Sequence, residues 1–386
     1  MEKLIYLDYN ATTPIAAAVA AAMRPFLDLE GTFGNPSSSH AFGIEARDAV
    51  EEARAKVASM LGCDSDEVLF TSGGTESNNT AIIGTARARR HEGRHIVTSA
   101  VEHPAVSEVC AYLAAEEGAS VTIVPVDSTG LVDPADVEAA VTPETVLVTV
   151  MHANNEVGTI QPIADIARIA RAKGGPHLVV HSDGAQSVGK VPTRVRELDV
   201  DLFSIAGHKL YAPKGVGALY IRRGTPLAKL MHGANHERNR RAGTENVLEI
   251  VGLGEAAALA ETNLETASRH MRATRDRLLA HLRQGLPSSA LVLNGHAELC
   301  LPNTLNVSFP GLEADKILEG LTAVAASAGA ACHSGTVTAS HVLRAMGVED
   351  HVAMGAIRFS TGRYTTEEEI DRAAEQIIEV VRRLGS

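Results

Sequence analysis

The sequence predicts an α/β fold: a large domain with a mostly parallel sheet covered by helices, followed by a smaller α+β domain. Short β-branched runs alternate with helical stretches from residue 68 to residue 221, which is typical of a buried parallel sheet. A long helical stretch, from about residue 248 to residue 286, then separates this part from a different pattern. The length of 386 residues suits two domains.

The alternating part contains seven candidate strands. They lie at residues 68–70, 95–98, 121–124, 146–150, 178–180, 202–205 and 218–221. Apolar residues at helical spacing predict a helix over 44–61 before them, with Gly62 as its stop. In such sheets ligands bind beyond the carboxyl ends of the strands, so residues that follow each run are candidates for a site.

The smaller part contains candidate strands at 304–309, 323–327 and 357–360, and a last helix over 367–384.

Composition and charge exclude several classes of function. The net charge of −12 argues against direct binding to nucleic acid, which needs a basic surface. The four cysteines form no C-x-x-C pair, so we expect no metal site and no disulfide framework. The N-terminus lacks the apolar segment of a signal peptide, and no apolar run is long enough to span a membrane. We therefore expect a cytoplasmic protein that does not bind membranes.

The first candidate motif, residues 71–79, follows a strand and opens a helix. Its glycines allow a tight turn, with Gly74 and Thr75 at the turn. The helix that follows begins with N–H groups that have no partner, and phosphate binds readily at such a helix N-terminus. A plain turn with a helix cap explains the same residues about equally well.

Two further motifs place titratable side chains after strands. His103 precedes Pro104, which would begin the next helix, so His103 would face the cleft. A single histidine is more often structural. Asp183 ends a buried strand. Burying a carboxylate there costs free energy unless it is paired, for example with a protonated ring nitrogen. A helix-capping or turn role is the alternative for Asp183.

Lys209, Cys332 and two arginines complete the candidates. Lys209 ends a strand beside a histidine and a glycine, a position that favours covalent binding of a carbonyl cofactor, although most lysines are simply solvated. Cys332 lies in a turn of small residues that could expose a reactive thiol, although most free cysteines are buried and structural. Arg358 and Arg363 could hold a carboxylate, or form surface ion pairs.

Together these residues are what pyridoxal-phosphate (PLP) chemistry requires, and their order resembles the cysteine desulfurases, class V members of the fold-type I PLP enzymes. The likeness also covers residues 6–14, 31–37, 151–156, 236–246 and 340–347. It implies a large PLP-binding domain of residues 15–260. A small domain of residues 1–14 and 261–386 would carry the loop with Cys332.

The resemblance also assigns roles. Lys209 would bind PLP covalently and move protons, His103 would stack on the ring and help to move protons, and Asp183 would bind the ring nitrogen. Gln186 and Asn155 would contact the side of the phenolic oxygen. The phosphate would be held by Gly74, Thr75 and His208, and by Thr244 of the partner in a homodimer. Asn155 and Arg358 would bind the substrate, and Cys332 would be the nucleophile that becomes a persulfide.

The implied reaction converts L-cysteine to L-alanine and passes sulfur to an acceptor protein, such as an iron–sulfur scaffold or a thiolation enzyme. Two residues depart from the housekeeping desulfurases. Ala206 replaces a phosphate-binding serine, and His333 follows the cysteine where threonine is usual. Selenocysteine lyases look similar at both places. The sequence therefore leaves open a selenocysteine lyase, another class V aminotransferase or lyase that would not need Cys332, and a non-catalytic protein on the same fold.

Overall fold

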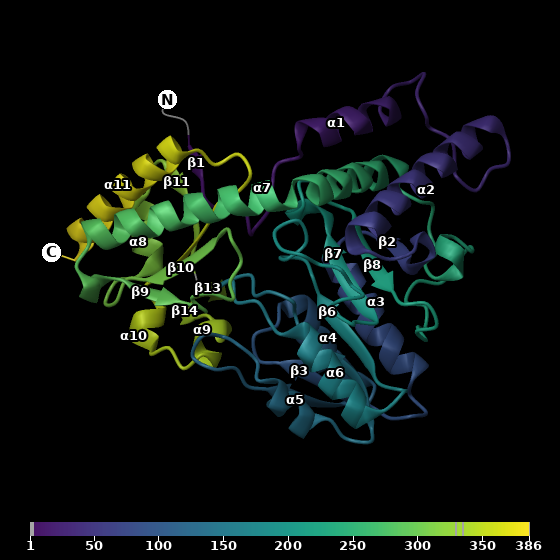
Figure 1. Ribbon diagram of the computed structural model, residues 1–386, viewed down its shortest axis with the longest axis horizontal. Helices are drawn as coiled ribbons and strands as arrows, with labels where there is room; N and C mark the ends of the chain where they lie inside the picture. Colours follow the sequence, from purple (N-terminus) through teal and green to yellow (C-terminus); the bar gives the residue numbers. More distant parts are fainter. Residues whose placement is uncertain (1–3, 329, 334–335, 386) are drawn as a thin grey trace.

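The computed structural model describes residues 4–328, 330–333 and 336–385, and the side chains of residues 330–338 lie outside this description. Figure 1 shows a large and a small unit, joined along one side by the long helix α7 (Val247–Gly285). Both ends of the chain lie at the small unit. The long helical stretch that the sequence predicts is confirmed to within a residue at each end.

A seven-stranded sheet forms the centre of the large unit, in the order β2-β8-β7-β6-β5-β3-β4. The strands are β2 (Val68–Thr71), β3 (His95–Ser99), β4 (Ser120–Val124), β5 (Thr145–Thr149), β6 (Val179–Asp183), β7 (Leu202–Ala206) and β8 (Gly217–Ile221). Only β8 among them runs antiparallel to its neighbours, β2 and β7. All seven expected strands are present, and the sheet is mostly parallel as predicted.

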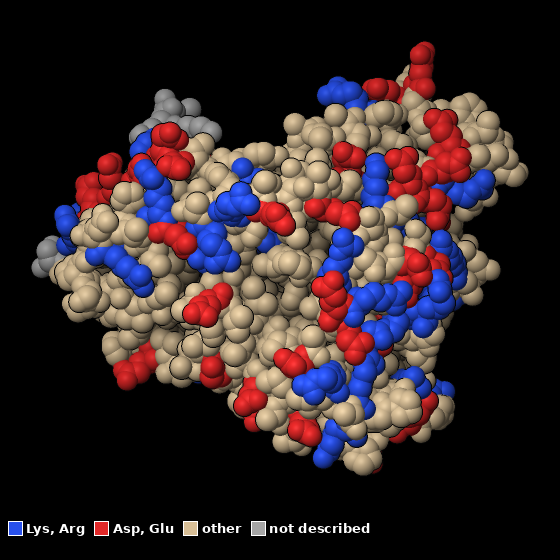
Figure 2. Space-filling model, viewed as in Figure 1, with Lys and Arg blue, Asp and Glu red and all other residues tan. Residues whose placement is uncertain are grey.

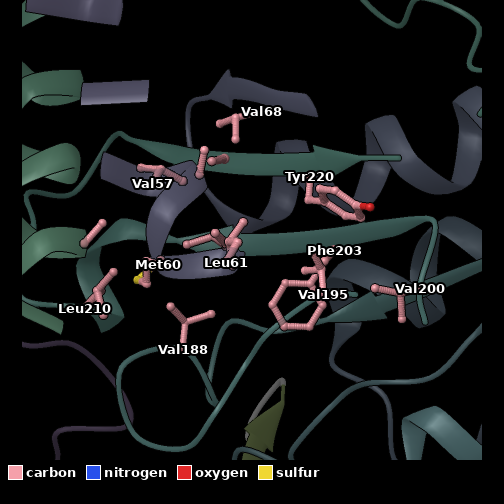
Figure 3. Close-up of a cluster of buried hydrophobic side chains, with 14 of the residues drawn as sticks. Val57, Met60, Leu61, Val68, Val188, Val195, Val200, Phe203, Leu210 and Tyr220 are labelled. Carbon is pink, nitrogen blue, oxygen red and sulfur yellow. The ribbon is translucent and has the colours of Figure 1, made fainter. Parts of the chain in front are cut away.

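Helices cover this sheet on both faces because its strands are apolar on both faces. Neighbouring residues such as Val97 and Ile96, or Val148 and Leu147, belong to different buried clusters, as the alternation of a strand requires. The covering helices are α2 (Ala41–Leu61), α3 (Gly74–Ala88), α4 (Pro104–Glu116), α5 (Pro134–Ala140) and α6 (Ile163–Gly174), while α1 (Ala17–Met23) packs on α7. Figure 3 shows one such cluster, where Leu61 of α2 packs near Phe203 and Tyr220 of the sheet.

Helix α2 ends where the sequence predicts, at Gly62. This glycine has a φ of 68°, the left-handed conformation that closes many helices. Further along, α2 packs closely on α7, where a Cβ on Gly254 would lie 2.6 Å from the Cβ of Ala53. The close contact of these helices therefore requires glycine at position 254.

The small unit is built on a four-stranded antiparallel sheet, β12-β15-β10-β9, comprising Ser327–Ala328, Ala356–Ser360, Thr304–Ser308 and Val292–Asn294. Helices α8 (Ala314–Gly320) and α11 (Glu367–Leu384) enclose a separate buried cluster with this sheet and the second half of α7. The N-terminal strand β1 (Ile5–Tyr6) joins this unit by pairing with β11 (Val324–Ala325). The division of the chain near residue 260 stays a prediction, since that residue lies inside α7.

The surface carries both signs of charge. Figure 2 shows acidic and basic side chains interspersed over the two units, and many of them form ion pairs, such as Arg223 with Asp66 at 2.8 Å. Among the residues that the structure describes, no helix is both long enough and apolar enough to cross a membrane.

Candidate active site

One cavity, of about 290 Å³, lies at the carboxyl ends of the strands of the large sheet. Nine residues that the sequence analysis selects line it: Gly74, Thr75, His103, Asn155, Asp183, Gln186, His208, Lys209 and Arg358. The volume is close to the lower end of the usual range for small-ligand sites, about 300–1,000 Å³. The chain therefore folds nine candidates from six separate stretches of the sequence into a single pocket.

Lys209 enters the pocket from a short helical turn (Gly207–Lys209) directly after β7. Its Nζ donates hydrogen bonds to the backbone oxygens of Asn10 and Ala11, the second at 2.8 Å. Burial, and then the charge of Arg358, lower the pKa of Lys209 to about 8. A neutral, nucleophilic amine is thus accessible near physiological pH.

Asp183 is the last residue of β6 and is held in one orientation by two donors. Its Oδ1 accepts a hydrogen bond from the backbone N–H of Ala185 at 2.9 Å, and its Oδ2 accepts one from Nδ2 of Asn78 at 2.7 Å. Asn78 lies on α3 and is buried, with no partner for its Oδ1 among the described residues. The pair places a fixed carboxylate in the pocket wall.

His103 caps α4, and Glu102 fixes the turn before it. Nδ1 of His103 accepts a hydrogen bond from the N–H of Ala105 at 3.1 Å, and burial lowers the pKa of the ring. The Glu102 side chain accepts hydrogen bonds from Ser99 at 2.6 Å and from the N–H of Met151 at 2.9 Å. Burial raises the pKa of Glu102 to about 8. The flat imidazole of His103 therefore lines the cavity, and its lowered pKa favours the neutral form.

The N-terminus of α3 supplies an anion-binding element. Gly73 precedes it with a φ of 146°, a conformation that favours glycine, and a Cβ placed there would meet nothing within 4 Å. The first turn of α3, with Gly74 and Thr75, lines the pocket and offers the unpaired N–H groups of a helix start. Ala206 lies opposite, its Cβ 3.2 Å from where a Cβ on Gly74 would be. Burial lowers the pKa of His208, on the same wall, to about 4.

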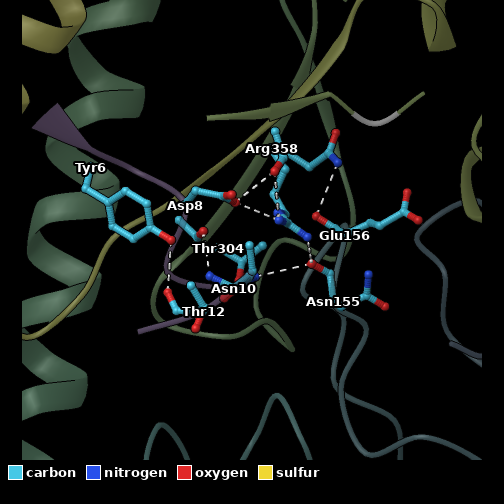
Figure 4. Close-up of polar contacts among 12 residues, drawn as sticks. Tyr6, Asp8, Asn10, Thr12, Asn155, Glu156, Thr304 and Arg358 are labelled. Atoms are coloured by element: carbon cyan, nitrogen blue, oxygen red, sulfur yellow. Dashed lines mark hydrogen bonds and ion pairs between the residues drawn. The ribbon is translucent and has the colours of Figure 1, made fainter. Parts of the chain in front are cut away.

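Arg358 lies on β15 of the small unit and lines the pocket. Three hydrogen-bond partners hold its guanidinium (Figure 4). It donates to Asp8 at 2.7 Å, to Ser327 at 3.1 Å and to the backbone oxygen of Asn155 at 3.0 Å. Its Nε is buried and has no partner among the described residues. Three of the five guanidinium N–H groups thus hold the side chain in place, while the Nε–H is left without a protein partner among the described residues.

Asn10 is a pocket residue that sequence reasoning missed as an individual. Its side chain donates to Thr304 at 2.8 Å and accepts from Asn303 at 2.9 Å, while its backbone oxygen accepts from Lys209 and from Gln186. Asn10 therefore links Thr304 of the small unit, as Figure 4 shows, to the lysine. Both Asn10 and Asn78 lie inside motifs that the sequence singles out, but a single asparagine carries no pattern that separates this role from a turn.

Three selected residues do not join this cavity. Arg363 is stacked on the ring of Tyr211, with its Cζ 4.7 Å from the ring centre, so the expectation that it helps Arg358 hold a carboxylate is wrong. Thr244 lines a separate hollow with Thr71 and Arg241. The backbone of Cys332 lies in β13 (Ala330–His333), which pairs with β14 (Thr336–Ala339), while its side chain lies outside the described part.

Comparison with known proteins gives one consistent family. The model of the aminotransferase class-V family matches residues 5–373. The cysteine desulfurase IscS of Dictyoglomus turgidum is 46% identical over 386 residues, which is all of this chain and 96% of that protein.

Solved structures agree with this likeness. A NifS-like protein superposes with a TM-score of 0.91 at 40% identity, over 99% of this chain and 100% of that one. SspA, solved in complex with cysteine, superposes with a TM-score of 0.80 at 34% identity, over 94% of this chain and 99% of that one.

Proposed function

The chain belongs to the aminotransferase class-V family and, within it, to the cysteine desulfurases, and from this premise we propose that it converts L-cysteine to L-alanine and carries the sulfur on Cys332. The observation that supports this best is the convergence of Lys209, Asp183 and the start of α3 on one cavity. An amine, a carboxylate and an anion-binding helix end are complementary to the aldehyde, the ring nitrogen and the phosphate of PLP.

The residues of the cavity fit PLP, the cofactor on which this family depends. Asp183 would bind the protonated ring nitrogen, Lys209 the carbonyl carbon, and Gly74, Thr75 and His208 the phosphate. His103 would lie against the ring face, and Gln186 and Asn155 would lie on its oxygen side. When bound, PLP withdraws electrons from the Cα of the substrate and so makes a proton on that carbon removable.

The protein's own groups then perform the remaining steps. Arg358, with its free Nε, binds the substrate carboxylate, and Asn155 contacts the same end of the substrate. Lys209 takes the proton from Cα, for which its lowered pKa suits it. The Cys332 thiolate attacks the substrate sulfur, the Cβ–S bond breaks, and its electron pair stays on Cβ. A proton then adds to Cβ, alanine leaves, and a persulfide remains on Cys332.

We place this reaction in a homodimer. The hollow that contains Thr244 lies outside the cavity of its own chain, so Thr244 would bind the phosphate in the partner's cavity. The sulfur would pass to an acceptor protein, such as an iron–sulfur scaffold or a thiolation enzyme. Because Cys332 must be a free thiol between turnovers, the reducing cytoplasm is the compartment that we propose.

A selenocysteine lyase is the second candidate function. Ala206 in the pocket wall and His333 beside the cysteine favour it, because both match that group of enzymes. The test is alanine release from L-cysteine and from L-selenocysteine by the PLP-loaded protein. We expect steady turnover of L-cysteine. Near-zero alanine from L-cysteine beside fast release from L-selenocysteine would overturn the first assignment.

A further inference from the structure

A second lysine, Lys190, lies behind the cavity and takes no part in the mechanism above. It follows β6 in a run of turns, four residues after Gln186, and only 5% of its surface is exposed. It does not line the cavity, whereas Lys209 does. Burying a lysine amine costs free energy unless hydrogen bonds replace its contacts with water, so its partners decide whether it is tolerated there.

The Lys190 amine makes two hydrogen bonds, both to side-chain amide oxygens. Its Nζ lies 3.0 Å from Oε1 of Gln186 and 3.0 Å from Oδ1 of Asn10. Among the residues that the structure describes, no carboxylate pairs with it. Burial, and then the charges of Lys209 and Arg358, hold the pKa of Lys190 well below its usual range. In either protonation state the amine carries at least the two N–H groups that these two acceptors require.

These contacts decide how the Gln186 amide is oriented. Oxygen and nitrogen of a glutamine amide have nearly the same shape, so only the partners distinguish them. One end of the amide lies 3.0 Å from the backbone oxygen of Asn10, which can only accept, so that end is Nε2. The other end is therefore Oε1, and Lys190 supplies the donor that it needs.

This orientation of the Gln186 amide leaves an N–H donor for the cavity. Nε2 of Gln186 carries two N–H groups, and Asn10 uses one of them. Gln186 lines the cavity, so its second N–H is available there. Without Lys190, Oε1 would be a buried acceptor with no partner, a loss that favours rotation of the amide away from this orientation.

We propose that Lys190 is a positioning residue that fixes the Gln186 amide, so that one of its N–H groups donates to the oxygen substituent of the cofactor ring. This inference rests on the proposed use of PLP. A hydrogen bond to that oxygen stabilises its deprotonated form and so shifts the pH at which the absorbance of the bound cofactor changes.

The experiment compares the absorbance midpoints of PLP-loaded wild type, Lys190→Met, Gln186→Leu and the double variant across pH. We expect Lys190→Met to raise the midpoint by about half to one pH unit, the equivalent of one hydrogen bond. Gln186→Leu removes the donor itself, so the double variant should have the midpoint of Gln186→Leu alone. An unchanged midpoint in Lys190→Met, or additive shifts in the double variant, would overturn the proposal.

Controls separate positioning from folding. Lys316→Met removes an exposed lysine of α8 and should leave the midpoint unchanged. If Lys190→Met does not fold, Lys190→Gln retains an amide donor, and its midpoint should lie between those of wild type and Gln186→Leu. A lower unfolding temperature with an unchanged midpoint indicates a purely structural lysine and contradicts the proposal. Wild type without any cofactor absorbance would instead refute the proposed function.

Discussion

Lys209 and Cys332 lie in two parts of the molecule that are built differently. Lys209 follows an interior strand of the seven-stranded sheet and bonds to the backbone of Ala11, while nearby Asp183 is held by hydrogen bonds from α3 and from the turn after β6. Cys332 lies in a two-stranded hairpin, and among the described strands β13 pairs only with β14. A two-stranded hairpin has little stability of its own.

The contacts that fix this hairpin to the large unit lie just after it. Ser340 donates to Glu156 at 2.5 Å, and Nε2 of His341 bonds to the backbone oxygen of Glu102 at 3.0 Å. Glu156 follows Asn155, and Glu102 precedes His103, so both anchors adjoin residues that line the cavity. The pocket that we propose for the cofactor is therefore preorganised, whereas Cys332, the proposed sulfur carrier, lies in a separate hairpin anchored beside it.

The largest effect should follow the loss of Lys209. Lys209→Ala removes both the proposed covalent link to PLP and the proposed proton-transfer group, so alanine formation should fall by about 10²–10⁴-fold or more. Alanine assays and the absorbance of the dialysed protein measure the two losses. Lys214→Ala, which changes an exposed lysine, is the matched control. Retention of the cofactor absorbance after dialysis of Lys209→Ala would contradict the role of this lysine.

Loss of Cys332 should stop sulfur transfer but leave the cofactor pocket unchanged. Cys332→Ser should abolish sulfur transfer and steady turnover, because a hydroxyl is a poor nucleophile toward sulfur at neutral pH. The cofactor absorbance should stay as in wild type. Full activity of Cys332→Ser on L-cysteine would show that the reaction is that of an ordinary class V aminotransferase or lyase.

The pKa of Lys209 should govern how fast the cofactor-free protein takes up PLP. The neutral amine is the nucleophile, and its pKa is lowered to about 8. Below about pH 8 the rate should therefore rise about tenfold per pH unit, and it should level off above that pH. Stopped-flow absorbance across pH checks this. A rate that still rises at the ordinary lysine pKa, about 10.4, would contradict the lowered value.

The smallest effect should come from the cavity wall at Ala206. Ala206→Ser adds a hydroxyl opposite the start of α3, where the phosphate would lie. One added hydrogen bond of about 0.5–1.5 kcal/mol would lower the Kd of PLP by roughly 2–10-fold. Equilibrium titration of the cofactor-free protein measures it, with Ala206→Gly as the reference that adds no donor. Equal affinity in wild type and Ala206→Ser would place the phosphate elsewhere.

Sequence reasoning identified the fold and most of the cavity because strand ends carry a strong pattern. Asp183 and Lys209 follow β-branched runs that only a buried sheet explains, and the structure brings them together. Arg363 was misassigned because its spacing from Arg358 says nothing about the ring of Tyr211, which it covers. Asn10, Asn78 and Lys190 were missed because their roles depend on partners far away in the sequence.

The most direct test of sulfur transfer to Cys332 is to locate the sulfur after reaction with L-cysteine, by peptide mass spectrometry of the PLP-loaded protein. Cys63 and Cys110 serve as internal references, since burial raises the pKa of both thiols to about 12 and keeps them protonated. We expect one additional sulfur on the peptide that contains Cys332, formed together with alanine. Alanine without sulfur on that peptide, or sulfur on another cysteine, would contradict the account.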